Sequence, residues 1–220
     1  MNTKVRATLA SDFLEHFQAV SFSVQYPRGM ALIEQGAFVE QVSVVEEDVL
    51  KTAQLTESGA EIIIGLVLPG SITGLTSVIL RERSPVSVIT VTRVRMVHIP
   101  ARVFLQRLEQ AGLFACQVYK SLCSEYNCLL SSLVDAKSMT ARSRLLTVFH
   151  TLANAARAAD AEEDARSLLR HWELAQLVGV TPEHLSRILR DLNIRKRTTA
   201  QGRSPEQTDA CLAGTAIIKR

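Results

Sequence analysis

The sequence has few of the features that mark membrane proteins, secreted proteins or enzymes. No run of about 18 apolar residues is present and the N-terminus lacks a cleaved-signal pattern, so we expect a cytoplasmic protein without membrane contact. Its four cysteines show no CxxC spacing, which fits a reducing compartment. A Gly-rich phosphate loop, a nucleophile elbow and a metal-ligand cluster are all missing, and an enzyme is therefore not expected.

The net charge of +3 is too small to indicate nucleic-acid binding by itself, but its distribution is uneven. Residues 165–203 hold eight Lys and Arg side chains against three Asp and Glu, an excess of five positive charges, whereas residues 1–164 sum to −2. A polyanion would meet this positive C-terminal third. The alternative is an ordinary solvated basic surface.

The composition is that of a globular protein. The 220 residues, 47% of them hydrophobic and 21% charged, allow one large or two small domains. Between residues 20 and 99, short β-branched stretches alternate with Gly and Pro turn signals, which favours a small antiparallel β-roll or barrel. A short amphipathic helix is expected at residues 11–19, and strands at residues 20–24, 42–45, 61–68, 86–92 and 95–99.

After Pro100 the pattern becomes helical, with a short helix at residues 104–108 and a long one from 113 to about 135. Apolar residues recur along the long helix at spacings of three and four. It is too apolar to stand alone, so we expect one face on the roll and another on a symmetry mate. The alternative is a core helix within one chain. The candidate dimer-interface residues are Val118, Leu122, Tyr126, Leu129 and Leu133.

Residues 171–192, which follow a predicted helix at 142–158, have the pattern of a helix-turn-helix. Gly179 supplies the turn, because an L-residue resists a positive φ. Thr181 is a good N-cap and Pro182 suits the first helical position, so these two residues mark the start of the second helix. The buried face of that helix is expected to consist of Leu185, Ile188, Leu189 and Leu192.

Three outward side chains of the second helix are the candidate base readers, namely Glu183, Ser186 and Arg187. They share one face in the first two turns, the part of a recognition helix that enters the major groove. An arginine there bonds guanine O6 and N7, and a glutamate accepts from cytosine N4. The alternative for Glu183 and Arg187 is an i,i+4 surface ion pair. Candidate contacts to the DNA backbone are Thr181, Arg190, Arg195, Lys196 and Arg197.

The L-A…G-x-T-P-E…S-R frame at residues 174–187 resembles that of the CRP/FNR family of bacterial regulators. The resemblance spans about residues 20–195 and implies a β-roll, a dimerisation helix and a winged helix-turn-helix. The E-x-x-S-R spacing is similar to the FNR branch, which reads TTGA-type half-sites. The resemblance also implies a homodimeric transcription activator that binds double-stranded DNA and RNA polymerase. The residues similar to the family's roll turns are Gly29, Gly36, Gly59, Pro69–Gly70 and Gly74.

The family's ligand-binding residues are only partly matched. Cyclic-nucleotide binding in this family uses a glutamate after the roll glycine and an Arg-Ser pair for the cyclic phosphate. Here Leu75 follows Gly74, so cyclic AMP is not expected. Arg83 and Ser84 resemble the phosphate pair, although they come slightly early, and the alternative is a polar turn before a strand.

The cysteines and histidines do not identify a cofactor. FNR holds an iron–sulfur cluster through N-terminal cysteines, and because no cysteine precedes Cys116 this cluster is not expected. Cys116 and Cys123 lie seven residues apart on the predicted dimer helix, where they form a redox switch or serve as small apolar residues at a packed seam. His98 and His150 are haem ligands in principle, but a lone histidine is more often structural.

These patterns together predict an α+β protein. Residues 1–110 form a β-roll sensor domain like the cyclic-nucleotide-binding domain, 111–137 the dimerisation helix and hinge, and 138–203 the helix-turn-helix domain. Residues 194–203 provide at most one strand and a basic turn, and residues 204–220 match no wing. The alternative function is a ligand-binding sensor whose DNA binding is impaired.

Overall fold

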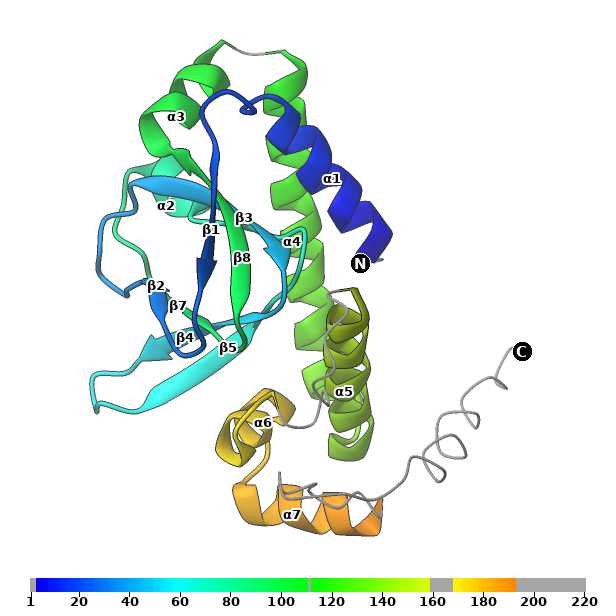
Figure 1. Ribbon diagram of the computed structural model, residues 1–220. Helices are drawn as coiled ribbons and strands as arrows, with labels where there is room; N and C mark the ends of the chain where they lie inside the picture. The colour runs from blue at the N-terminus through cyan, green and yellow to red at the C-terminus, as the bar shows by residue number, and fades with distance from the viewer. Residues whose placement is uncertain (1–2, 111, 159–167, 193–220) are drawn as a thin grey trace.

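The structure, a computed structural model, describes residues 3–110, 112–158 and 168–192. It has the expected α+β class, with an antiparallel β-roll and a set of helices that extends to one side of it and below it (Figure 1). The strands are β1 (Phe22–Tyr26), β2 (Ala31–Ile33), β3 (Gln41–Glu47), β4 (Leu50–Leu55), β5 (Glu61–Val67), β6 (Ile72–Thr73), β7 (Ser87–Thr90) and β8 (Val94–Pro100).

The roll consists of two four-stranded sheets, ordered β1-β8-β3-β6 and β2-β7-β4-β5, in which every pair is antiparallel. Each of the five predicted strands overlaps an observed one, with small shifts at the ends. The sequence did not predict β2, β4 or β6. β2 and β6 are very short, and β4 (LKTAQL) carries polar residues between its apolar ones.

The helices are α1 (Thr3–Glu15), α2 (Leu75–Leu80), α3 (Ala101–Glu109), α4 (Leu113–Ser138), α5 (Ala141–Ala158), α6 (His171–Val178) and α7 (Pro182–Asp191). The predicted helix at residues 11–19 needs correction, since α1 begins eight residues earlier and ends at Glu15. Among the described residues, no helix combines the length and the apolarity needed to span a bilayer.

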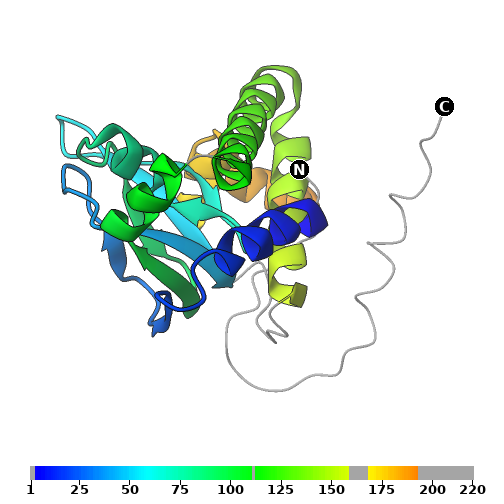
Figure 2. The same ribbon diagram turned by 90° about the horizontal axis from the view of Figure 1, so that it is seen from above.

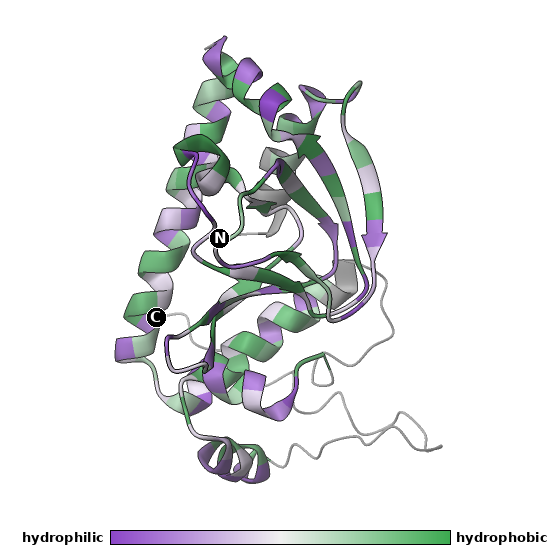
Figure 3. Ribbon diagram, turned by 90° about the vertical axis from the view of Figure 1, so that its left-hand side faces the viewer, coloured by the Kyte–Doolittle hydropathy of each residue, from purple (hydrophilic) through white to green (hydrophobic). Residues whose placement is uncertain are grey.

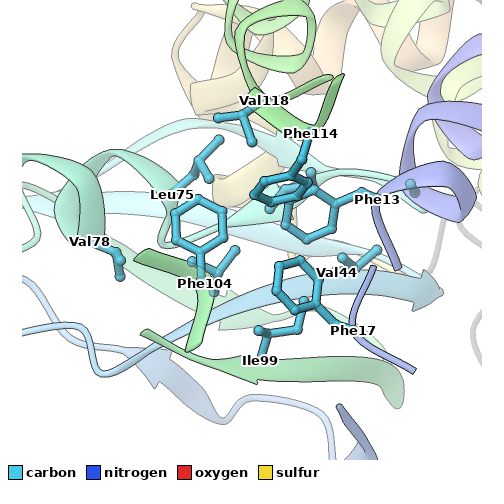
Figure 4. Packing of buried hydrophobic residues seen from close by; sticks show 12 residues of the cluster. Phe13, Phe17, Val44, Leu75, Val78, Ile99, Phe104, Phe114 and Val118 are labelled. Atoms are coloured by element: carbon cyan, nitrogen blue, oxygen red, sulfur yellow. The ribbon is translucent and has the colours of Figure 1, made fainter. Parts of the chain in front are cut away.

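Helix α1 is attached to α4 by an aromatic cluster (Figure 4). The ring centroid of Phe13 lies 5.5 Å from that of Phe17 and 5.6 Å from that of Phe114, at the start of α4. Phe104 of α3 completes the cluster, and all four rings are almost fully buried. Figure 2 shows α1 beside α4 along the roll. Such rings dominate core burial, so this cluster fixes the first turns of α4 on the roll.

A second core lies where the roll meets the C-terminal helices. Leu145 and Leu152 of α5 are fully buried in it, together with Leu185 of α7. Val49 and Val91, both from the roll, belong to the same cluster. The helices after α4 therefore pack against the roll as well as against one another.

Candidate nucleic-acid interface

The predicted turn between two helices is present at Gly179. This residue ends α6 with φ 70° and ψ 45°, and its amide donates to the carbonyls of Ala175 and Gln176. The Val180 amide then donates a hydrogen bond to Ala175 O at 3.0 Å. An L-residue at Gly179 would be strained in this left-handed conformation, so the glycine sets the angle at which α7 leaves α6.

The start of α7 is also built as the sequence predicts. Thr181 is the N-cap, and its side-chain oxygen accepts from the His184 amide at 3.3 Å. Pro182 occupies the first helical position, where its missing N–H costs nothing. The start of α7 is thereby fixed by two adjacent residues.

The inner face of α7 packs on the helices behind it. Leu185 and Ile188 are buried there, and Ala175 of α6 is 1% exposed at the crossing of the two helices. The Arg144 guanidinium of α5 donates to Val178 O through Nε at 2.7 Å, and to Met139 O through Nη1 at 2.7 Å. Helices α5, α6 and α7 therefore form one compact unit.

The candidate base readers lie on the outer face of α7. Glu183, Ser186 and Arg187 are all exposed, as are the backbone candidates Thr181 and Arg190. In Figure 1 α7 is the outermost described element at the lower end of the molecule, and Figure 3 shows hydrophilic and hydrophobic residues alternating along it. An exposed helix with an apolar inner face and a polar outer face suits insertion into a groove.

The surroundings of the Glu183 carboxyl favour its ionised form. Its own backbone amide and the Thr181 side chain lower the pKa of its carboxyl, with smaller contributions from Arg187 and His171. The carboxylate therefore stays ionised at neutral pH and is available to accept hydrogen bonds.

Ser186 has a partner that the sequence did not predict. Its hydroxyl donates to Pro182 O at 3.0 Å and lies 3.1 Å from Nε2 of His171, the first residue of α6. His171 is only partly exposed and stands beside the base-reading face. It belongs to the candidate site. Nothing in the local sequence indicates this, because the contact depends on how the two helices cross.

The dimer prediction needs one correction on α4. Val118 is 1% exposed and packs in the aromatic core with Phe114, so it does not belong to an outward face, and Leu122 is half-buried against the same core. The remaining candidates, Tyr126, Leu129 and Leu133, are 62%, 58% and 59% exposed. Beside them the outer face also contains Tyr119, Leu130 and Val134. These six exposed residues form an apolar strip on α4, which has more members than the predicted interface and does not include Val118.

The roll residues that would hold a cyclic nucleotide do not fit that ligand. Gly74 is the N-cap of α2 with φ 79°, and the following Leu75 is buried in the core, where it offers no partner to a ribose hydroxyl. The Arg83 guanidinium donates to Gly36 O at 2.8 Å and lies over the Phe38 ring. Ser84 is buried and donates to Val86 O at 2.7 Å. Arg83 and Ser84 thus both bond the backbone around the loop, and their phosphate and polar-turn alternatives stay predictions.

The predicted roles of several other residues stay untested. Cys116 and Cys123 are exposed on α4, and their redox and packing alternatives stay predictions. Within residues 3–110, 112–158 and 168–192, no group of His, Cys, Asp and Glu is arranged to hold a metal ion. Arg195, Lys196 and Arg197, the wing region and residues 204–220 lie outside the described residues.

Comparison with known proteins identifies the roll and the overall fold. Residues 23–111 match the family model of the cyclic nucleotide-binding domain. No curated protein matches the sequence significantly. Among solved structures, FixK2 of Bradyrhizobium japonicum is similar with a TM-score of 0.65 and 17% identity, over 79% of this chain and 85% of that one.

Two further structures extend this likeness. CLP of Xanthomonas campestris, described as a c-di-GMP responsive global regulator, has a TM-score of 0.62 and 19% identity over 87% of this chain and 96% of its own. TTHA1359 of Thermus thermophilus, described as a transcriptional regulator of the CRP/FNR family, has a TM-score of 0.59 and 17% identity over 78% and 86%. At these identities the likeness concerns the fold.

Proposed function

We propose that this chain, whose fold resembles that of the CRP/FNR regulators as the sequence predicts, is a sequence-specific DNA-binding transcription regulator. The observation that carries the proposal is the exposed face of α7. Glu183, Ser186 and Arg187 lie there on a helix whose start is fixed by Thr181 and Pro182. In this arrangement Arg187 reads a guanine, and Glu183 accepts from a cytosine amino group.

The proposed active form is a homodimer. Dimers of this kind place two recognition helices about 34 Å apart in successive major grooves. The exposed apolar strip of α4 is the proposed contact between the two copies, because an apolar helix face of this length is otherwise left in water. Arg190 supports binding by contacting phosphate, and by resemblance to the family the bound dimer acts on RNA polymerase.

Binding to a TTGA…TCAA palindrome tests the proposal. We expect tight binding, weaker binding to a scrambled duplex, and a linear fall of the logarithm of the binding constant with the logarithm of salt concentration. Sedimentation of the complex should give two chains per duplex.

The second candidate is a sensor whose DNA binding is impaired. It is favoured by the sequence, in which residues 204–220 match no wing, and it predicts no salt-dependent retention on either duplex. Equal weak binding to both sequences would support this candidate against the first.

A further inference from the structure

Helix α6 is docked on the last strand of a roll sheet. The Gln176 side chain makes two bonds to the backbone of β5, since its Oε1 accepts from the Ile63 amide at 2.8 Å and its Nε2 donates to Glu61 O at 2.9 Å. Because β5 is an edge strand, this amide side chain takes the place of a neighbouring strand. These two bonds therefore fix the position of α6 along β5.

A buried cation reinforces the same contact. Lys51 of β4 is 6% exposed, and its ammonium lies 2.8 Å from Glu173 Oε1 of α6 and 2.8 Å from Glu61 Oε1 of β5. The Trp172 ring lies over the ammonium at 5.2 Å. Burial alone would lower the pKa of Lys51, but the bonds to Glu173 and Glu61 outweigh it and the pKa is raised, so the lysine stays charged.

Glu173 serves both sides of the contact. One carboxylate oxygen bonds Lys51, and the other accepts from the Arg170 amide at 2.7 Å, at the start of α6. Glu173 is itself 6% exposed. A buried charge pair of this kind adds little net stability but penalises arrangements that leave one charge unpaired. Its physical effect is thus to select one orientation of α6 relative to the roll.

The orientation of α6 determines that of α7. The two helices are joined by the Gly179 turn and share one core, to which α5 also belongs. Helix α5 is separated from α4 by Met139, a residue with an extended backbone. The docked arrangement leaves α7 outermost with its base-reading face uncovered (Figure 1). If α6 left β5, the helical unit would turn about the α4–α5 joint.

We infer that Lys51 is a positioning residue for DNA binding, acting through Glu173 to hold α6 on the roll and thereby to orient α7. This inference rests on the proposed function. Because a dimer must place two recognition helices at a fixed spacing, a unit that moves freely must be reordered on binding, which weakens affinity. Lys51 itself lies on the roll and has no role in contacting DNA.

The test uses the full-length protein with Lys51→Met and Glu173→Gln combined, which removes both buried charges and leaves only Glu61, whose side chain is 36% exposed to water, without its cation. Arg95→Met is the matched control, since it also removes a cation paired with two glutamates, but in the other sheet. Gln176→Ala is a second variant that removes only the bonds to β5, at an exposed position expected to tolerate the change.

For the double variant and for Gln176→Ala we expect a loss of affinity for the palindrome of roughly 5–150-fold, the usual range of coupling between two parts of a protein. Amide exchange at Ile63 should accelerate. The slope of affinity against salt should stay at the wild-type value because no phosphate contact is lost, which separates positioning from DNA contact. Arg95→Met should change none of these.

Two results would overturn the inference alone: unchanged affinity of the double variant while the wild type binds tightly, or unchanged exchange at Ile63 in that variant. A wild-type protein that does not retain DNA would instead overturn the proposed function, and the positioning role with it. If the double variant fails to fold, Glu173→Gln alone, which leaves Lys51 paired with Glu61, decides the outcome by the same two measurements.

Discussion

The Tyr26 hydroxyl lies 2.8 Å from Nε2 of His98, on the neighbouring strand of the first sheet. The other ring nitrogen, Nδ1, lies 2.7 Å from the Ser43 hydroxyl, and His98 is 1% exposed. Both nitrogens are thus used within the roll, which supports the structural role over haem ligation. Burial lowers the pKa of His98 below its usual 6.5.

The roll should lose stability in mild acid because of His98. Its folded pKa lies below 6.5, so as the pH falls through 6.5 the unfolded chain takes up a proton that the folded one does not. The stability is present above 6.5 and is lost below it, by up to about 1.4 kcal/mol per pH unit. Urea unfolding at pH 5–7 measures this slope. His98→Gln should flatten it, and His184→Gln, at an exposed position, should not.

Gly74→Ala should destabilise the roll more than Gly59→Ala. Both glycines have φ near 80°, so each substitution carries the strain of the left-handed region, about 1–2 kcal/mol. At Gly74 a Cβ would also lie 2.8 Å from Gln41 O and 2.9 Å from Val39 Cγ1, whereas at Gly59 nothing lies within 4 Å. We expect an additional loss of about 1–3 kcal/mol at Gly74 in the free energy of unfolding. Equal losses would mean that the crowding is relieved by backbone movement.

Arg187→Ala should weaken binding to the palindrome by about 1–3 kcal/mol and relax the preference for one G·C pair. The side chain is exposed on α7, so the fold should be unaffected. Titrations with duplexes substituted at single positions measure the effect. Arg93→Ala, an exposed arginine of the roll, is the charge-matched control and should leave the preference intact. An unaltered preference in Arg187→Ala would contradict the base-reading assignment.

Leu133→Glu should shift the protein from dimer to monomer, because it places a charge in the apolar strip of α4. Val118→Ala should instead lower the free energy of unfolding by about 2 kcal/mol and leave the dimer intact, since Val118 packs inside one chain. Analytical ultracentrifugation and urea unfolding separate the two effects. Dissociation caused by Val118→Ala would place the interface elsewhere.

The parts of the site that the sequence predicts are those with local signals. Thr181 and Pro182 act on the same helix start, and Gly179 acts on the turn just before it, so each can be recognised within three residues. The docking of α6 has no such signal. Lys51 and Glu173 are 122 residues apart, and a lysine in a polar stretch is ordinarily an exposed residue.

The long helix shows the same limit in another form. Apolar residues lie on more than one face of this helix, and the sequence does not decide which face meets the roll. The choice is made by Phe13 of α1 and by Phe17 in the turn after it, which cover Phe114 and so bury Val118 on that side. Leu129 and Leu133 lie farther along α4 and stay exposed.

The contact between Gln176 and β5 also bears on solubility. An uncovered edge strand templates strand-to-strand aggregation, and Glu61–Val67 (EIIIGLV) combines β-branched residues with a single charge. Gln176 occupies one donor and one acceptor of that edge, while Ile62 and Ile64 remain 48% exposed. Light scattering of Gln176→Ala should therefore reveal faster self-association than wild type, and binding of the palindrome duplex should slow it by keeping α6 over the edge.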